Sequence, residues 1–304
     1  MDKVLVIVGP TAVGKTALSI QLAKKFNGEI ISGDSMQIYC DLNIGTAKVT
    51  AAEMAGVPHY LINERKMDEN YSVADFQASA RQKIQEIKTA GKLPIIVGGT
   101  GLYIQALLYD FKLGGKEELA DQELRADLEK LAAEIGNQEL WQLLQTKDTL
   151  AASKIHFNNR KKVIRALEVF EKTGQSIFTP QEEPQALYDY LMIGLNTQRE
   201  LLYNRINQRV DLMLTEGLLA EAESLAPHPE YQSAQGIGYK EFFPYFASEA
   251  TLEEAVEQVK QNSRRYAKRQ LTWFRNRSQA QWFDLVTPQN DLAEIEQLVN
   301  DWLK

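Results

Sequence analysis

The sequence is poor in the residues that form disulfides and zinc sites. It contains one cysteine, Cys40, and three histidines, His59, His156 and His228, which lie far apart. A single cysteine excludes an intramolecular disulfide, and the histidine spacing excludes the usual zinc motifs. No apolar run reaches the roughly 18 residues of a membrane-spanning helix. The N-terminus lacks the charged and apolar regions of a signal peptide, so we expect a cytoplasmic protein.

Acidic residues are in excess, but the basic residues gather in two blocks. The net charge is −7 over 304 residues, which by itself disfavours a nucleic-acid partner. However, Lys154–Arg165 carries five basic residues and no acidic one, and Lys260–Arg277 carries seven and none. Either block alone is also typical of a solvated helix face. Two such blocks in an acidic chain predict a surface that binds a polyanion.

Apolar, β-rich runs alternate with helical patterns along most of the chain. This alternation predicts an α/β fold, a P-loop NTPase-like parallel sheet with helices on both faces. Between about Glu117 and Lys172 the pattern is helical and charged without a strand, so we expect a helical insertion to interrupt the sheet. The predicted core covers residues 1–115 and 187–304, and the insertion covers residues 116–186. The predicted strands are Val4–Val8, Glu29–Asp34, His59–Ile62, Leu93–Val97 and Leu187–Leu195.

A glycine-rich motif, "GPTAVGKT", lies between the first strand and the first helix. It matches the pattern GxxxxGK[ST], in which loop N–H groups and a helix N-terminus surround an anion. Lys15 adds a full positive charge, and the hydroxyl of Thr16 is suited to ligate Mg²⁺. The motif predicts a site for phosphate or diphosphate, made of Gly9, Ala12, Val13, Gly14, Lys15 and Thr16.

The sequence lacks the acid that P-loop hydrolases carry at the end of a later strand. Leu93–Val97 is followed by Gly98 and Gly99, which can neither hold Mg²⁺ nor position a water. Asp34, at the end of the second strand, is the carboxylate best placed near the phosphates, because ligands bind beyond the carboxyl ends of parallel strands. We interpret Asp34 as a general base or an indirect metal ligand. The alternative is an ordinary turn or helix-capping residue.

Two further groups of residues suit a phosphorylated ligand. Arg205 and Arg209 lie one helical turn apart, and arginine binds phosphate in bidentate fashion, although a surface ion-pair face is equally typical of this spacing. Tyr266, Trp273 and Phe274 lie among the basic residues of the second block. This mixture suits phosphate contact with base stacking, or the packing of that helix against a core.

Six blocks of sequence follow one another along the chain: "GPTAVGKT", "ISGDSMQIYCDLNIGTAK", "PIIVGGTGLY", "NNRKKVIRALEVFEKTG", "QGIGYKE" and "AKRQLTWFRN". Together they resemble the bacterial tRNA dimethylallyltransferase (tRNA isopentenyltransferase) family, and the resemblance runs from Val4 to about Phe283. It implies transfer of a dimethylallyl group from dimethylallyl diphosphate to N6 of the adenosine at tRNA position 37, beside the anticodon. Eukaryotic relatives append a zinc-finger segment, and since the sequence has no such Cys/His pair we expect the bacterial form.

The resemblance implies a role for each part of the phosphate site. The P-loop would hold the diphosphate leaving group with Mg²⁺, so no hydrolytic water and no acid after Val97 are needed. Asp34 would accept the proton of the adenine amine. Lys15 and Thr16 would neutralise charge on the departing diphosphate. Thr11 and either Arg205 or Arg209 would also contact it, and the resemblance leaves the choice between the two arginines open.

The resemblance also implies a tRNA surface. The helical insertion would hold the anticodon stem-loop, and the target base would leave its stack to reach Asp34. We expect a monomer, since neither a self-complementary apolar stripe nor a coiled-coil heptad is present. The residues that match tRNA-contacting segments are Asp34, Ser35, Met36, Gln37, Thr100, Arg125, Lys161, Lys162, Arg165, Gln235, Gly238, Tyr239, Lys240, Lys268, Arg269, Trp273 and Arg275.

Three other functions fit part of the sequence. An adenylate isopentenyltransferase would share the P-loop and base, but a mononucleotide does not require two basic blocks. A small-molecule kinase would use the same strand–loop–helix unit for ATP and would carry an arginine-rich lid. A non-catalytic tRNA-binding protein would leave the P-loop and Asp34 without a role.

Overall fold

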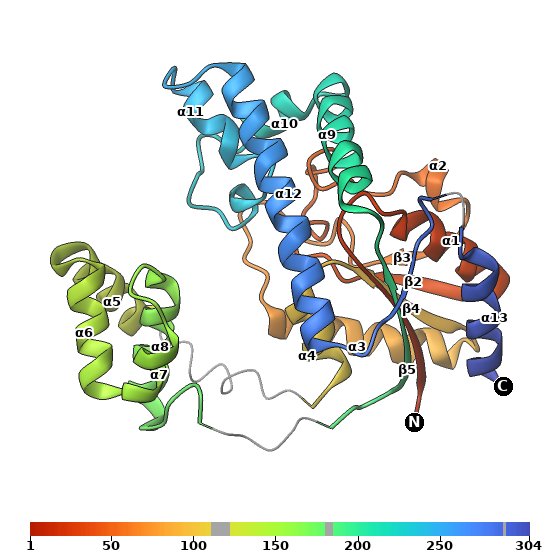
Figure 1. Cartoon of the computed structure of the whole chain (residues 1–304), viewed down its shortest axis with the longest axis horizontal. Helices are drawn as coiled ribbons and strands as arrows, with labels where there is room; N and C mark the ends of the chain where they lie inside the picture. Colours follow the sequence, from red (N-terminus) through yellow and green to blue (C-terminus); the bar gives the residue numbers. More distant parts are fainter. Residues whose placement is uncertain (111–121, 180–184, 288–289) are drawn as a thin grey trace. The chain divides into compact units, whose positions relative to one another are not determined.

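The computed structural model describes residues 1–110, 122–179, 185–287 and 290–304. The chain divides into two units, Met1–Asp110 with Ala186–Lys304, and Phe111–Gln185 (Figure 1). The boundary predicted between residues 115 and 116 lies outside the described residues.

A six-stranded parallel sheet forms the centre of the first unit, in the order β3-β2-β4-β1-β5-β6. β1 lies between β4 and β5, with Leu5 opposite both Ile95 and Leu191. Its residues Val4 to Val8 are all fully buried, which explains the uninterrupted apolar run. The predicted parallel α/β fold is confirmed. The strands are β1 (Lys3–Val8), β2 (Gly28–Ser32), β3 (His59–Tyr60), β4 (Leu93–Gly98), β5 (Asp189–Leu195) and β6 (Gln281–Phe283).

Helices cover both faces of this sheet. One face, with Val4, Val6 and Val8, packs against α3 and α4, and the opposite face, with Leu5 and Ile7, packs against α1 and α13. α9 and α12 stand beside each other at the end of the sheet (Figure 1). The helices of this unit are α1 (Lys15–Lys25), α2 (Ala51–Met54), α3 (Val73–Thr89), α4 (Gly101–Leu108), α9 (Arg199–Glu216), α10 (Leu218–Glu223), α11 (Phe243–Phe246), α12 (Leu252–Arg277) and α13 (Leu292–Leu303), with short 3₁₀ turns at Ser233–Gln235 and Lys240–Phe242.

Capping residues define where α3 and α12 begin. Ser72 starts α3 and Thr251 starts α12, and each side chain accepts the backbone N–H of an acidic residue three positions later. The acids, Asp75 and Glu254, bond back to the cap residue. These capping boxes provide hydrogen-bond acceptors for N–H groups at the helix start that would otherwise have no partner.

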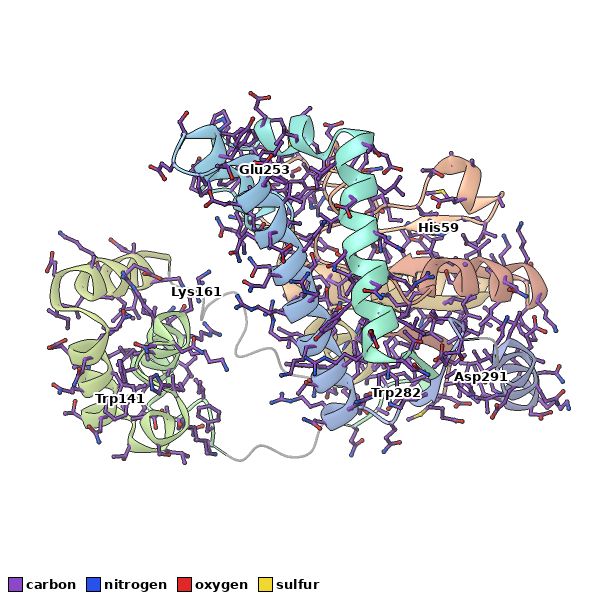
Figure 2. All side chains as sticks on the ribbon, turned by 45° about the horizontal axis from the view of Figure 1, so that its top comes forward. His59, Trp141, Lys161, Glu253, Trp282 and Asp291 are labelled. Atoms are coloured by element: carbon purple, nitrogen blue, oxygen red, sulfur yellow. The ribbon has the colours of Figure 1, made fainter. Side chains whose placement is uncertain are left out.

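The second unit is a helical bundle with its own core. Its apolar centre includes Leu140, Leu144, Val163 and Leu167. Trp141 lies among the helices, where its indole N–H donates to the carbonyl of Ile155 at 2.7 Å (Figure 2). The helices are α5 (Gln122–Ile135), α6 (Asn137–Lys147), α7 (Thr149–Lys154) and α8 (Arg160–Thr173). Across the described parts of both units, no helix is both long enough and apolar enough to cross a membrane.

Candidate active site

The loop between β1 and α1 has the backbone shape of a phosphate cradle. Gly9 has φ +143°, and a Cβ there would lie 2.4 Å from the carbonyl oxygen of Leu195, so only glycine fits. Ala12 and Gly14 also have positive φ, at 68° and 96°. Gly14 is the N-cap of α1 and provides no side-chain cap. The first amides of α1 are therefore available to an anion.

Two cations converge on this loop from different elements. Lys15 Nζ donates to the carbonyl of Pro10 at 2.7 Å, and Arg209 of α9 donates to Thr11 Oγ1 at 2.9 Å. Burial, and next the charge of Arg209, lowers the pKa of Lys15 to about 8, against a smaller opposing effect of Asp34. Burial also lowers the pKa of Arg209. Two desolvated cations side by side repel each other and favour a bound polyanion.

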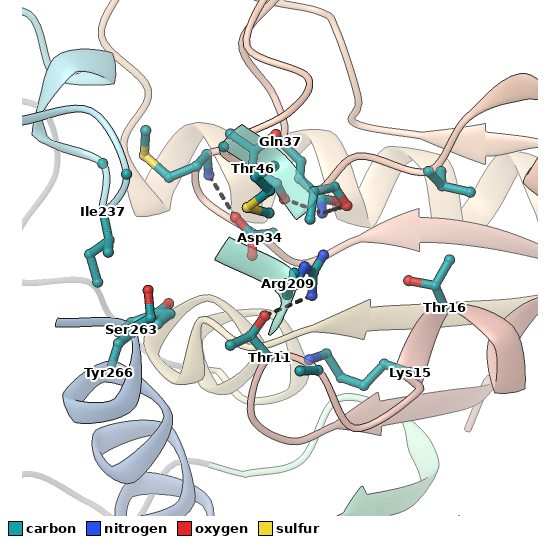
Figure 3. A pocket seen from close by; sticks show the side chains of 18 of the residues that line it. Thr11, Lys15, Thr16, Asp34, Gln37, Thr46, Arg209, Ile237, Ser263 and Tyr266 are labelled. Atoms are coloured by element: carbon teal, nitrogen blue, oxygen red, sulfur yellow. Dashed lines mark hydrogen bonds between the residues drawn. The ribbon is translucent and has the colours of Figure 1, made fainter. Parts of the chain in front are cut away.

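The two candidate arginines differ in their surroundings. Arg209 is half-buried and faces the same space as Lys15 (Figure 3). Arg205 is exposed, and its Nε donates to the carbonyl of Ala12 at 2.8 Å. Both side chains contact the P-loop. Arg209 presents its charge to the interior of the site, whereas Arg205 supports the loop from its rim.

Asp34 lies in the irregular segment that follows β2. Its Oδ1 accepts the backbone N–H of Met36 at 2.9 Å, which fixes the carboxylate in a turn. The next residue, Ser35, donates its N–H to Thr100 Oγ1 at 3.2 Å. Gln37 accepts from the hydroxyl of Ser32 and donates to the carbonyl of Thr46, at 3.0 and 3.2 Å. Side-chain contacts therefore hold a segment that has no helix or strand of its own.

One cavity of about 1010 Å³ contains both the P-loop side chains and Asp34. Asp34 and Arg209 lie between the Lys15–Thr16 side of this cavity and the side formed by Ile237, Ser263 and Tyr266 (Figure 3). The volume exceeds what a diphosphate alone would fill. The site can thus hold a phosphorylated ligand next to a second, larger reactant.

Tyr266 of α12 lies opposite the P-loop. Burial, followed by the negative charge of Asp34, raises the pKa of its phenol to about 12. The guanidinium of Arg269 stands 5.6 Å from the centre of its ring. Tyr266 therefore offers a neutral hydroxyl near the carboxylate of Asp34, and its flat ring lies at the cavity wall.

The segment after Asp34 is anchored from outside the cavity by Glu221 of α10. Its carboxylate accepts the backbone N–H groups of Asn43, Ile44 and Gly45, at distances of 2.7 to 3.1 Å. The hydroxyl of Tyr239 donates to the same carboxylate at 2.7 Å. Sequence reasoning did not find Glu221, because a single acid in a short helix carries no pattern that marks such a role.

The residues predicted to contact tRNA fall into exposed and buried groups. Tyr239 is fully buried, and burial raises the pKa of its phenol. Its side chain therefore holds Glu221 and is not part of the exposed surface. Gly238 is buried as well, and Trp273 is half-buried against Gly101, with Arg277 over its ring at 4.6 Å. The cavity wall includes Ser35, Met36, Gln37, Gln235, Lys240 and Arg269. Lys268 and Arg275 of α12 are exposed. Of the cavity-lining residues, Gln235, Lys240 and Arg269 are exposed as well.

In the helical unit, three of the four predicted residues are exposed, Arg125, Lys161 and Lys162, and two of the four are held by one acid. Lys161 lies on the surface of α8 (Figure 2), and the neighbouring Lys162 is exposed as well. Arg125 and Arg165 both donate to Glu168 Oε2, at 2.8 and 2.9 Å, and Glu168 is fully buried. This shared carboxylate fixes the positions of both guanidinium groups.

The described residues offer little to a metal ion on their own. They contain no group of three His, Cys, Asp or Glu side chains that could hold one. The hydroxyl of Thr16 does line the cavity beside the phosphate cradle. Mg²⁺ commonly keeps several waters and binds through few protein groups together with ligand phosphates. The site therefore fits Mg²⁺ that is bound jointly by Thr16 and a diphosphate.

The fold and the site define a P-loop protein in which one cavity joins the P-loop to a carboxylate. The family model described as IPP transferase matches residues 37–277, and the chain belongs to this family. This confirms the resemblance inferred from the six sequence blocks. The match to the family model begins after the P-loop and Asp34, and the alignments with full-length relatives include both.

Full-length relatives and solved structures agree with this family. The chain is 67% identical over 304 residues to the tRNA dimethylallyltransferase of Enterococcus faecalis, covering 100% of this chain and 98% of that protein. It is 48% identical to the structure of the tRNA isopentenylpyrophosphate transferase from Bacillus halodurans, with a TM-score of 0.76 and coverage of 100% and 97%. A eukaryotic dimethylallyltransferase acting on tRNA is 32% identical, with a TM-score of 0.83 and coverage of 100% and 80%.

Proposed function

We propose that this protein transfers a dimethylallyl group from dimethylallyl diphosphate to N6 of the adenosine at position 37 of tRNA, in the cytoplasm and as a monomer. The observation that carries the proposal is the shared cavity, in which Asp34 faces the cations of the P-loop. The names of the full-length relatives support the same reaction.

In the proposed reaction, the lone pair of N6 attacks the first carbon of the dimethylallyl group. The bond from that carbon to the diphosphate oxygen breaks, and the diphosphate leaves with the electron pair. Asp34 accepts the proton that N6 loses. Lys15, Arg209 and the amides of the P-loop stabilise the negative charge of the leaving group. Mg²⁺, held by Thr16 and the diphosphate, would neutralise part of the same charge.

The acceptor can be tested directly with radiolabelled dimethylallyl diphosphate and Mg²⁺. Unmodified tRNA with adenosine at position 37 and free AMP are supplied in parallel. We expect label in the tRNA alone, which would also explain the exposed lysines of both units. Label in AMP alone would assign the protein to the mononucleotide enzymes. Label in neither would favour the kinase alternative, in which the P-loop binds ATP.

The pH dependence should reflect the low pKa of Lys15. Below pH 8 the lysine is protonated and binds diphosphate, and above pH 8 it loses its charge. We expect kcat/KM for dimethylallyl diphosphate to fall by about tenfold per pH unit above pH 8. Lys15→Met should remove this decline above pH 8, and a decline that persists in the variant would assign it to another group.

The same pKa shift should affect the stability of the fold in the opposite direction. Burying the ammonium of Lys15 costs stability below pH 8, and this cost is relieved between pH 8 and 10.5. The free energy of unfolding should therefore rise over this pH range.

The two basic blocks should determine how tRNA binding depends on salt. Lys161→Ala or Lys268→Ala removes one exposed cation from each block. Each change should weaken tRNA binding and reduce the slope of log K against log salt by up to about 1. Lys24→Ala, an exposed lysine of α1 outside both blocks, is the matched control. Equal slopes in all four proteins would show that these blocks are not the tRNA surface.

A further inference from the structure

Two glycines at the end of β4, its last residue Gly98 and the following Gly99, make room for neighbouring groups. A Cβ on Gly98 would lie 2.2 Å from the carbonyl oxygen of Gly33, so the turn after β2 approaches its backbone directly. A Cβ on Gly99 would lie 2.0 Å from Nε2 of Gln270 in α12. The position where a hydrolase carries an acid is thus occupied by a side-chain amide from a distant helix.

Gln270 uses both ends of its amide to join two loops. Its Nε2 donates to the carbonyl of Gly99 at 3.1 Å, and its Oε1 accepts the backbone N–H of Thr11 at 3.3 Å. Gln270 is 5% exposed; its contact with Gly99 is buried, and its contact with Thr11 is partly buried. The hydroxyl of Thr11 in turn accepts from Arg209. Gln270 therefore holds the P-loop at the residue that also receives the buried arginine.

The helix that carries Gln270 also carries the side chains that face the proposed acceptor. Tyr266, one turn earlier, lines the cavity opposite the P-loop, and Lys268 and Arg269 are exposed on the same helix. A displacement of α12 would thus be transmitted to Thr11 through one amide. No other described side chain of α12 hydrogen-bonds to the P-loop.

We propose that Gln270 is a positioning residue, which fixes the P-loop relative to the helix that faces the tRNA. In this role it sets the distance between the diphosphate leaving group and the acceptor base. The proposal rests on the proposed transfer reaction and adds to it a residue of the cavity wall that acts through the P-loop. Without the amide, the buried carbonyl of Gly99 and the partly buried N–H of Thr11 would both lose their partner, and the loop would relax.

The first test compares Gln270→Met with Gln258→Met, an exposed glutamine on the same helix. Calorimetry with inorganic pyrophosphate and Mg²⁺ should show binding weakened about tenfold in Gln270→Met, as expected for the loss of two hydrogen bonds. The stoichiometry should stay at one per chain, and tRNA affinity should stay within about twofold. Unchanged pyrophosphate affinity with a lower melting temperature would assign Gln270 a purely structural role and overturn the proposal.

A double-mutant cycle provides a second test that does not depend on the methionine variant. Gly99→Ala should weaken pyrophosphate binding in the wild-type background, since the methyl group displaces the amide of Gln270. In a Gln270→Ala background it should add nothing, because the next nearest atom, the carbonyl oxygen of Gly9, lies 3.5 Å from the added Cβ. Additive losses would contradict the proposal. Absence of pyrophosphate binding in the wild-type protein would instead contradict the proposed function itself.

Discussion

Replacing Asp34 by asparagine is expected to lower the turnover of tRNA prenylation by about 10² to 10⁴, the usual contribution of a general base. Asparagine has the same shape and still accepts the N–H of Met36, so the turn after β2 should be kept. It does not accept a proton at neutral pH, which is the function that the change removes. Turnover is measured with labelled dimethylallyl diphosphate under saturating conditions.

The affinities for pyrophosphate and tRNA separate a chemical role from a binding role. Both should stay within about threefold of wild type in Asp34→Asn, because the cations of the P-loop and the exposed basic residues are unchanged. Asp41→Asn is the matched control, since Asp41 lies in the same segment with φ 63°, a conformation that asparagine adopts readily. A loss of tRNA affinity as large as the loss of turnover would make Asp34 a positioning group.

The second large effect is expected at Arg209. Arg209→Met removes a half-buried cation that faces Lys15 and donates to Thr11. We expect kcat/KM for dimethylallyl diphosphate to fall by about 10² to 10³, comparable to the loss of one donor that stabilises charge in a transition state. Protonation of Lys15 would no longer be opposed by a second cation, so the pKa of Lys15 should rise in this variant.

Arg205→Met provides the comparison that distinguishes the two arginines. Arg205 is exposed and donates to the carbonyl of Ala12, so its loss should reduce kcat/KM by less than about tenfold. Losses in the reverse order would assign the diphosphate contact to Arg205. Equal losses would indicate that both guanidinium groups clamp the ligand.

The parts of the site that could be predicted from sequence lie in short, local patterns. The P-loop is readable because loop glycines, a lysine and a helix start follow a strand within eight residues, Gly9–Thr16. Asp34 could be placed because it closely follows a strand, although β2 ends at Ser32 and not at Asp34 as predicted. The carboxyl ends of parallel strands meet at one edge of the sheet. The roles of Asp34 and of the tRNA-facing residues came from the family resemblance, and they stay predictions.

The remaining parts depend on contacts between residues far apart in sequence. Gln270 contacts Thr11, 259 positions away in sequence, and Gly99, 171 positions away. No local sequence pattern can indicate contacts over such separations. Arg205 and Arg209 share a helical face, so periodicity could not say which one is buried. The three residues of β6 were not predicted either, because so short a run forms a strand only where the edge of β5 is already present.

The position of β1 in the sheet has a consequence for synthesis on the ribosome. β1 is complete at Val8, but one of its two neighbours, β5, ends at Leu195. At roughly 5 to 20 residues per second, the β5 side of the central strand lacks its partner for about 10 to 40 s. The helical unit, built from contacts local in sequence, emerges during this interval and should fold first. We therefore expect nascent chains that stop before residue 189 to need chaperone protection of an open apolar edge, and chains that pass residue 195 to lose that need.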